Sequence, residues 1–185
     1  MEFQNAFVDL SKLFLIGVML IFVILGAQFK SVRISLIILM TIPFAFIGSM
    51  IGLIVGGNPF SIMTMYGMVA LAGIAVNDAI VMVSFINNHR KAGGSRWFSI
   101  IESGRVRLRP IILTSVTTIL GLMPMAIGLG GKSRSWGPLA STIIWGLLVA
   151  TLLTLLVIPT VYSIVVDDWF GAVPLKRWLK ARRVK

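Results

Sequence analysis

A carboxylate and an amide in the middle of a long apolar stretch are the residues of this chain best placed to do chemistry. Asn77 and Asp78 lie within the run GIAVNDAIVMV, residues 73–83, which is part of a longer apolar segment. A soluble helix has no reason to bury such a pair between apolar flanks. A membrane helix keeps a buried carboxylate only when a proton or a partner neutralises it, so Asp78 is the first functional candidate.

Two stripes of small and polar side chains accompany this pair. Successive helix residues point about 100° apart, so Asn77 and Asp78 face different neighbours. Asn77 shares its side of the helix with Gly67, Ala70 and Ser84. The next apolar segment carries a second stripe, made of Thr114, Thr117, Thr118 and Gly121. Arg107 lies two helical turns before Thr114.

Hydroxyl and amide groups suffice to hold helices together, but a carboxylate at mid-depth favours ion or proton coupling. The proton-coupling candidates are therefore Asp78, Asn77, Thr114 and Arg107. The alternative is that these side chains only hydrogen-bond one helix to another.

The composition indicates that the bilayer is the main solvent of the chain. Its 185 residues are 57% hydrophobic and 12% charged, with a mean hydropathy of +0.97, whereas soluble domains carry about 25% charged residues. Stretches of about 18 or more apolar residues predict transmembrane helices. Five such spans are predicted, at about residues 9–29, 34–57, 60–87, 110–130 and 136–166.

The connections between these spans are short except for the basic stretch 88–109. Within it, SRWFSIIESG predicts a short amphipathic helix on the cytoplasmic membrane surface, separate from the span that follows. Ser95 is its expected N-cap, and Pro110 is expected in the first turn of the next span. The predicted fold class is an all-α polytopic membrane protein with five transmembrane helices and this one surface helix.

The net charge of +11 is explained by membrane topology. If the N-terminus is outside, 14 of the 17 Lys and Arg residues fall in inner segments, and Lys12, Lys132 and Arg134 lie outside. This asymmetry follows the positive-inside rule and predicts an N-out, C-in arrangement with a basic cytoplasmic tail over residues 169–185. We therefore expect no nucleic-acid partner.

Other patterns inside the spans have structural explanations. Gly48, Gly52 and Gly56 form two overlapping G-x-x-x-G steps, which let helices approach closely in lipid. The sequence has no cysteine and no zinc, serine-nucleophile or paired-carboxylate signature, so no enzyme activity, metal site or cofactor is expected.

Three segments together resemble a known family. They are GIAVNDAIVMVSFIN, then ESGRVRLRPIILTSVTTILGLMPMAIG, then the last span with PLASTII and TLLTLLVIPTVY. In this order they are similar to the resistance-nodulation-division (RND) efflux transporters, and they look like the hydrophobe and amphiphile branch of multidrug, or acriflavine-resistance, pumps. The resemblance implies that residues 1–168 are a partial membrane domain, the last five of twelve helices.

The same resemblance implies the activity and the partners. Family members are trimers of the bacterial inner membrane that exchange external protons for substrates, with periplasmic domains, a periplasmic adaptor and an outer-membrane channel. It places Asn77 where the best-studied drug pumps carry a lysine, and Asp78 at the neighbouring amide position. Arg107 and Thr114 match an arginine and a threonine near the proton path. Because the lysine is missing, Asp78 is expected to carry a proton itself or to pair with a basic partner.

The sequence therefore predicts part of a proton-driven pump that exports hydrophobic or amphiphilic compounds and is inactive alone, its partners being the lipid bilayer and the remaining helices and periplasmic domains. One alternative is a truncated gene product, or a non-transporting membrane subunit that needs a partner chain. A weaker alternative is the metal-efflux branch of the same family, which shares the RLRP motif and the pattern of the final span.

Overall fold

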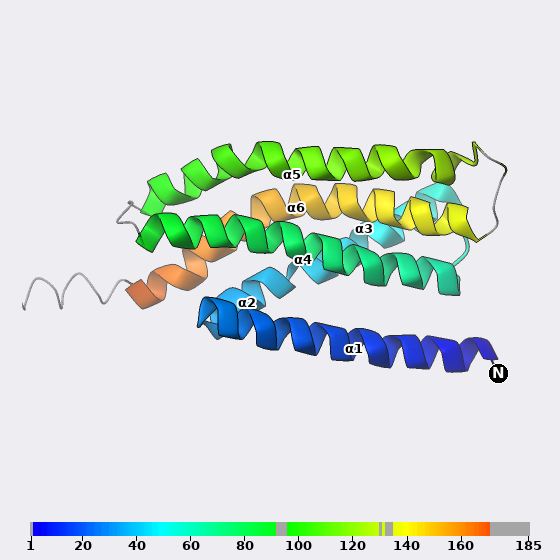
Figure 1. The fold of residues 1–185 in the computed structure, drawn as a ribbon, viewed down its shortest axis with the longest axis horizontal. Helices are drawn as coiled ribbons and strands as arrows, with labels where there is room; N and C mark the ends of the chain where they lie inside the picture. The colour runs from blue at the N-terminus through cyan, green and yellow to red at the C-terminus, as the bar shows by residue number, and fades with distance from the viewer. Residues whose placement is uncertain (1, 92–95, 130, 132–134, 171–185) are drawn as a thin grey trace, which may run out of the picture.

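The computed structural model describes residues 2–91, 96–129, 131 and 135–170. Their secondary structure is helical: α1 (Glu2–Phe29), α2 (Val32–Leu39), α3 (Thr41–Gly56), α4 (Ile62–Lys91), α5 (Arg96–Ile127) and α6 (Trp136–Phe170). Figure 1 shows the helices running roughly along one axis of an elongated bundle. The all-α fold class is confirmed.

Five helical segments are long and apolar enough to cross a membrane, with α2 and α3 together forming one of them. The segments are Gln4–Phe29, Val32–Gly56, Ile62–Lys91, Ile100–Ile127 and Trp136–Val165. The predicted number and order of long apolar helical segments are therefore confirmed. The predicted basic tail lies almost wholly outside the described residues, since α6 continues to Phe170.

The second span is broken at Met40, between α2 and α3, and the sequence explains why. Pro43 is the third residue of α3, and a proline has no N–H to donate to the carbonyl four residues earlier, which here belongs to Leu39. The proline ring also crowds that carbonyl. The chain therefore ends one helix at Leu39 and begins the next at Thr41, with the Met40 N–H bonded to the Leu36 carbonyl at 3.1 Å.

The prediction of a separate surface helix before the fourth span is wrong. α5 runs without interruption from Arg96 to Ile127, and Pro110 lies in its interior and not in its first turn. A proline inside a helix removes one backbone hydrogen bond, here the one to the Val106 carbonyl, but it does not have to end the helix. The expected N-cap, Ser95, lies outside the described residues.

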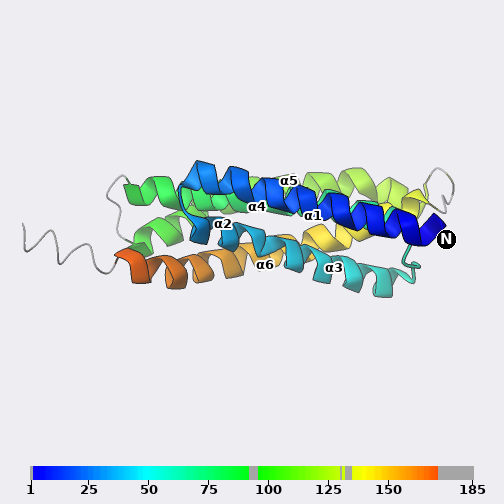
Figure 2. The ribbon, with the colours of Figure 1, turned by 90° about the horizontal axis from the view of Figure 1, so that it is seen from below.

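The centre of the bundle is built by α3, α4 and α6, and α6 packs most extensively against α3. In Figure 2, α3 and α6 lie along one side of the bundle and α1 along the other. The α1 and α5 spans are much less buried than the others. In their most apolar 18-residue stretches, 6% and 11% of the residues are buried, against 44–50% in the other three spans. The two outer helices are therefore the ones left open to lipid or to other helices.

Small residues bring α3 and α6 together. A Cβ atom added at Gly48 would lie 2.7 Å from Val149 Cβ, and one added at Gly52 would overlap the Trp145 side chain. The Ser49 hydroxyl donates to the Thr142 carbonyl of α6 at 3.4 Å. A Cβ atom added at Gly56 would lie 2.7 Å from Asn58 Nδ2 of the following turn and 3.3 Å from Ser141 Oγ of α6. This geometry supports a packing role against α6 for Gly48 and Gly52, and at the end of α3 for Gly56 as well.

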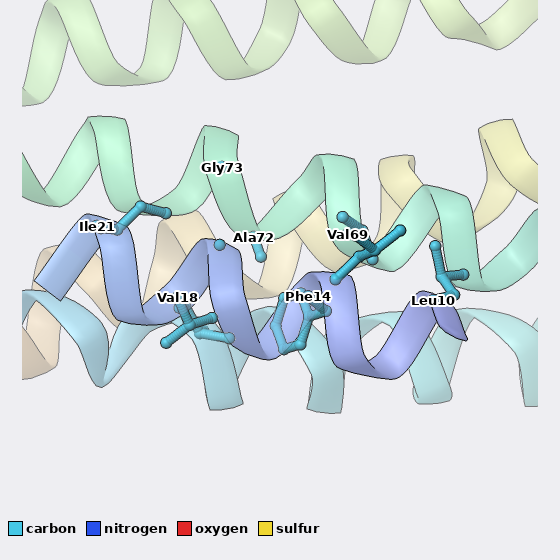
Figure 3. Close-up of a pocket in the computed structure, with 10 residues that line it drawn as sticks. Leu10, Phe14, Val18, Ile21, Val69, Ala72 and Gly73 are labelled. Carbon is cyan, nitrogen blue, oxygen red and sulfur yellow. The ribbon is translucent and has the colours of Figure 1, made fainter. Parts of the chain in front are cut away.

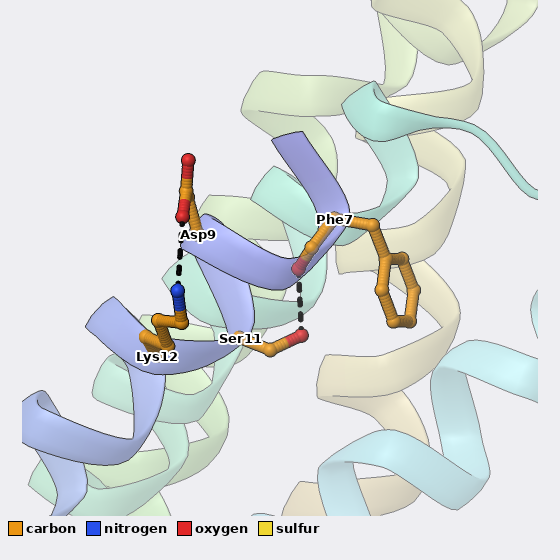
Figure 4. A network of polar contacts seen from close by, with 4 residues as sticks. All are labelled: Phe7, Asp9, Ser11 and Lys12. Atoms are coloured by element: carbon orange, nitrogen blue, oxygen red, sulfur yellow. Dashed lines mark hydrogen bonds and ion pairs between the residues drawn. The ribbon is translucent and has the colours of Figure 1, made fainter. Parts of the chain in front are cut away.

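An apolar pocket of about 180 Å³ separates much of α1 from α4. Figure 3 shows Phe14 and Val18 of α1 and Val69 and Ala72 of α4 around it. In its N-terminal part, α1 carries an exposed pair in which Lys12 Nζ lies 3.4 Å from Asp9 Oδ1, and Ser11 donates to the Phe7 carbonyl at 2.8 Å (Figure 4). These contacts stay within α1, so they do not attach it to the bundle.

Candidate functional site

Asp78 is buried near the middle of α4, with 8% of its surface exposed. It lies two turns from Leu71 on one side and two turns from Phe85 on the other, so the three residues share one face of the helix. Leu71 meets Gly146 of α6, and the Phe85 ring meets Arg107 of α5. Asp78 therefore faces the region where α4, α5 and α6 meet.

The Asp78 carboxylate makes no hydrogen bond or ion pair with any residue that the structure describes. Buried polar groups are normally hydrogen-bonded, and an isolated ionised carboxylate is costly in hydrocarbon. Within the described bundle, nothing compensates a charge on Asp78. This distinguishes it from the buried hydroxyl groups nearby, several of which donate to helix carbonyls.

Asn77 points elsewhere, as the helical geometry predicts. Its side chain is exposed, as is that of Ala70, while Ser84 is half-buried. Gly67, which the sequence analysis assigned to the same stripe, is instead buried against α6. A Cβ atom added at Gly67 would lie 3.1 Å from the Leu139 carbonyl oxygen. The stripe is therefore split, and its Asn77 side is left uncovered by the described helices.

Arg107 is placed on α5 over the ring of Phe85, with its Cζ atom 4.9 Å from the ring centroid. The Nε atom of Arg107 is buried and has no hydrogen-bond partner among the described residues. A guanidinium over an aromatic face gains cation–π attraction, which partly replaces the lost hydration. The contact fixes the relative heights of α4 and α5.

Thr114 lies at about the same height as Asp78. α4 and α5 run in opposite directions, Phe85 is seven residues after Asp78, and Arg107 is seven residues before Thr114. Asp78 on α4 and Thr114 on α5 therefore each lie two helical turns from the Phe85–Arg107 contact, in the same direction along the bundle. No hydrogen bond or ion pair joins Asp78, Asn77, Arg107 and Thr114 to one another, all four of which the structure describes.

The hydroxyl groups of α5 are satisfied mainly within their own helix. Thr114 Oγ1 donates to the Ile111 carbonyl at 2.9 Å, and Thr118 Oγ1 donates to the Thr114 carbonyl at 2.8 Å. Thr117 shares its proton between the carbonyls of Leu113 and Thr114. Such back-bonding lets exposed threonines face lipid or another helix without an unpaired donor.

One polar contact at this depth was not among the sequence predictions. Ser115 Oγ and Thr151 Oγ1 lie 2.9 Å apart and are both buried, which joins α5 to α6. The spacing of four residues from Arg107 through Ile111 to Ser115 could have identified Ser115 as part of the buried face of α5. Nothing in the sequence pairs it with Thr151, because the relative rotation of two apolar helices is a tertiary property.

Among the described residues, no group of three or more His, Cys, Asp and Glu side chains could hold a metal ion. The chemistry of this region is therefore that of one isolated carboxylate, a layer of hydroxyls and a nearby guanidinium. The carboxylate is the group of this set that can bind and release a proton, whereas the hydroxyls and the guanidinium can only orient and hydrogen-bond.

Comparison with known proteins places these features in a wider context. The model of the AcrB/AcrD/AcrF family matches residues 1–166. The cobalt-zinc-cadmium resistance protein CzcA of Cupriavidus metallidurans is 37% identical over 143 residues, which are 77% of this chain and 14% of that protein. The toluene efflux pump membrane transporter TtgB of Pseudomonas putida is 31% identical over 136 residues, which are 74% of this chain and 13% of that protein.

A solved structure is similar as well. The crystal structure of a heavy metal efflux pump, in its crystal form II, superposes with a TM-score of 0.79 at 32% identity, covering 87% of this chain and 16% of that one. The chain thus spans only 13 to 14% of the length of these two curated relatives.

Proposed function

The chain belongs to the AcrB/AcrD/AcrF family of RND efflux transporters, and on that premise we propose that it forms the last five membrane helices of a proton-driven pump in which Asp78 takes up and releases a proton. The observation that carries this proposal is the burial of Asp78, whose carboxylate has no partner among the described residues. Such a group is stable in hydrocarbon when it is neutral, or when a cation or water reaches it.

Asp78 can therefore exist in two states that need different surroundings. The neutral acid fits the bundle as described, since it leaves no uncompensated charge. The carboxylate needs a cation or water, so loss of the proton favours a different arrangement of the helices. A pump requires this kind of link between protonation and conformation.

The exposed polar side chains indicate where the remaining helices would pack. Asn77 on α4 and Thr114 and Thr117 on α5 are exposed, although they lie within membrane-spanning segments. We propose that helices from the rest of the pump cover these faces and supply the basic or water-filled side of the proton path. The inner-membrane location, the N-out, C-in topology, the trimer, the adaptor and the outer-membrane channel follow from the same family-based proposal.

Asp78→Asn in the complete transporter that contains this chain tests the proposal. The amide is nearly isosteric but cannot titrate, so efflux should be abolished or strongly reduced while membrane insertion and assembly stay intact. Asp9→Asn is the matched control, because Asp9 is an exposed acid in the N-terminal part of α1. Near-normal efflux by the Asp78→Asn variant at matched expression would remove Asp78 from the coupling mechanism.

We propose hydrophobic or amphiphilic compounds as the cargo, on the basis of the multidrug-like sequence pattern. Divalent metal ions are the second candidate. They are favoured by the 37% identity to CzcA and by the similarity to a heavy metal efflux pump, whereas the multidrug resistance protein MdtC of Erwinia tasmaniensis, at 35% identity, is almost as similar. The absence of a metal-binding cluster among the described residues does not separate the two, because cargo can also be bound by the rest of the pump.

The cargo class can be tested in a bacterial host that lacks its own RND pumps. The complete transporter, with its adaptor and channel, should raise resistance to toluene and cationic dyes if the cargo is amphiphilic. Resistance to cobalt, zinc and cadmium without any change toward toluene or dyes would contradict the first candidate and support the second. The Asp78→Asn variant should lose either activity.

A further inference from the structure

A continuous set of hydroxyl contacts connects α6 to Thr114. Thr151 Oγ1 lies 2.9 Å from Ser115 Oγ, and Ser115 Oγ lies 3.0 Å from the Ile111 carbonyl oxygen. The Thr114 hydroxyl donates to that same carbonyl oxygen at 2.9 Å. Among the described side chains of α5, only Ser115 hydrogen-bonds to another helix.

The Ile111 carbonyl is crowded with donors. In a regular α-helix it accepts the backbone N–H of residue 115, and here the hydroxyls of Thr114 and Ser115 reach it as well. A carbonyl oxygen has two lone pairs, so the three donors compete. Strong donation by Ser115 therefore weakens the hold on the Thr114 hydroxyl.

Thr151 decides where the Ser115 proton goes, because a serine hydroxyl has only one proton to donate. If Ser115 donates to Thr151, the Ile111 carbonyl is left to Thr114. If Thr151 donates to Ser115, the Ser115 proton turns to Ile111 and competes with Thr114. The two hydroxyls of the pair can exchange these roles, since either can be the donor.

We propose that Thr151 is a positioning residue for proton coupling, which acts through Ser115 and the Ile111 carbonyl on the hydroxyl of Thr114. The inference rests on the proposed function, because it gives Thr114 a role beside Asp78. Contact between α5 and α6 then sets how firmly Thr114 is held at the height of Asp78. A movement of α6 relative to α5 changes the orientation of the Thr114 hydroxyl without any direct contact between Thr151 and Thr114.

The first test is Thr151→Val in the complete transporter, with efflux measured at matched expression. Valine keeps the shape of threonine but offers Ser115 no acceptor, so transport should fall about two- to fivefold, the range expected from one intramembrane hydrogen bond. Thr151→Ser keeps the hydroxyl and should restore transport. The control is Thr142→Val. Thr142 is a buried threonine of the same helix, and its hydroxyl donates only within α6, to the Pro138 carbonyl at 2.8 Å.

Two backgrounds separate positioning from packing. In a Thr114→Val or a Ser115→Ala transporter, Thr151→Val should cause no further loss, because the route through which it acts is already broken. An equal additional loss in either background, or wild-type transport by Thr151→Val, would overturn the inference. Thr151→Ala provides a second variant without the hydroxyl in case Thr151→Val fails to insert.

The Asp78→Asn variant, measured in the same assay, keeps this inference distinguishable from the proposed function. If Asp78→Asn is inactive and Thr151→Val is unaffected, the positioning role fails and proton coupling at Asp78 stands. If Asp78→Asn transports normally, the proposed function fails.

Discussion

The contact between α3 and α6 predicts a large effect from one added methyl group. An alanine at Gly52 would place its Cβ atom inside the Trp145 side chain, against the Cβ atom that anchors that side chain to α6. A rotation of the indole cannot relieve such an overlap, so the helices must separate. Overpacking of this kind costs about 1–3 kcal/mol, and the separation also weakens the Ser49 hydrogen bond to the Thr142 carbonyl.

Replacing a glycine that has free space around it by alanine should instead leave the stability unchanged or raise it. An added Cβ at Gly121 of α5 meets nothing within 4 Å, and alanine is preferred over glycine in helices by about 1 kcal/mol. Unfolding of the purified transporter in mixtures of SDS and mild detergent would give both midpoints. We expect Gly52→Ala to unfold at a lower SDS fraction than wild type and Gly121→Ala at an equal or higher one. Equal midpoints for the two variants would refute the close approach of α3 and α6.

Three further predictions concern topology, completeness and the Arg107 contact. In a chain without cysteine, Ser135→Cys should react with an impermeant thiol reagent from outside and Lys91→Cys only from inside; outside labelling of Lys91→Cys would contradict the N-out, C-in arrangement. Expression of these 185 residues alone, in a host without RND pumps, should confer no resistance; robust efflux would contradict the prediction that these helices need the rest of the pump. Phe85→Leu should lower the SDS unfolding midpoint by removing the ring under Arg107, a loss of about 1 kcal/mol, whereas Phe85→Tyr should not; equal effects would argue against the cation–π contact.

The number and order of membrane spans could be read from the sequence because hydrocarbon imposes a minimum length on any crossing helix. Helix ends were less predictable, since polar and charged residues can extend a helix beyond the apolar segment. α4 thus continues through His89 and Arg90 to Lys91, and α5 begins 14 residues before Pro110. The error at Pro110 came from treating a proline as a helix start, although membrane helices tolerate proline in their interior.

The different orientations of Asn77 and Asp78 follow from helical geometry alone, and the structure agrees, since Asn77 is exposed and Asp78 is buried. Which of the two would be buried did not follow, because that depends on where α6 crosses α4. The Ser115–Thr151 contact was out of reach for the same reason: serine and threonine are common in membrane helices, and their partners are set by rotation and crossing angle. The roles of Asp78, Asn77, Arg107 and Thr114 in proton coupling remain predictions.

The central claim is that Asp78 carries a proton during transport, and proton flux in reconstituted vesicles tests it most directly. The complete transporter would be placed in proteoliposomes containing a pH-sensitive dye, and cargo would be added under an imposed pH gradient. We predict that the wild-type transporter moves protons only when cargo is present, and that Asp78→Asn, at equal protein content, moves neither protons nor cargo. Cargo-dependent proton movement by the Asp78→Asn variant at the wild-type rate would contradict the account.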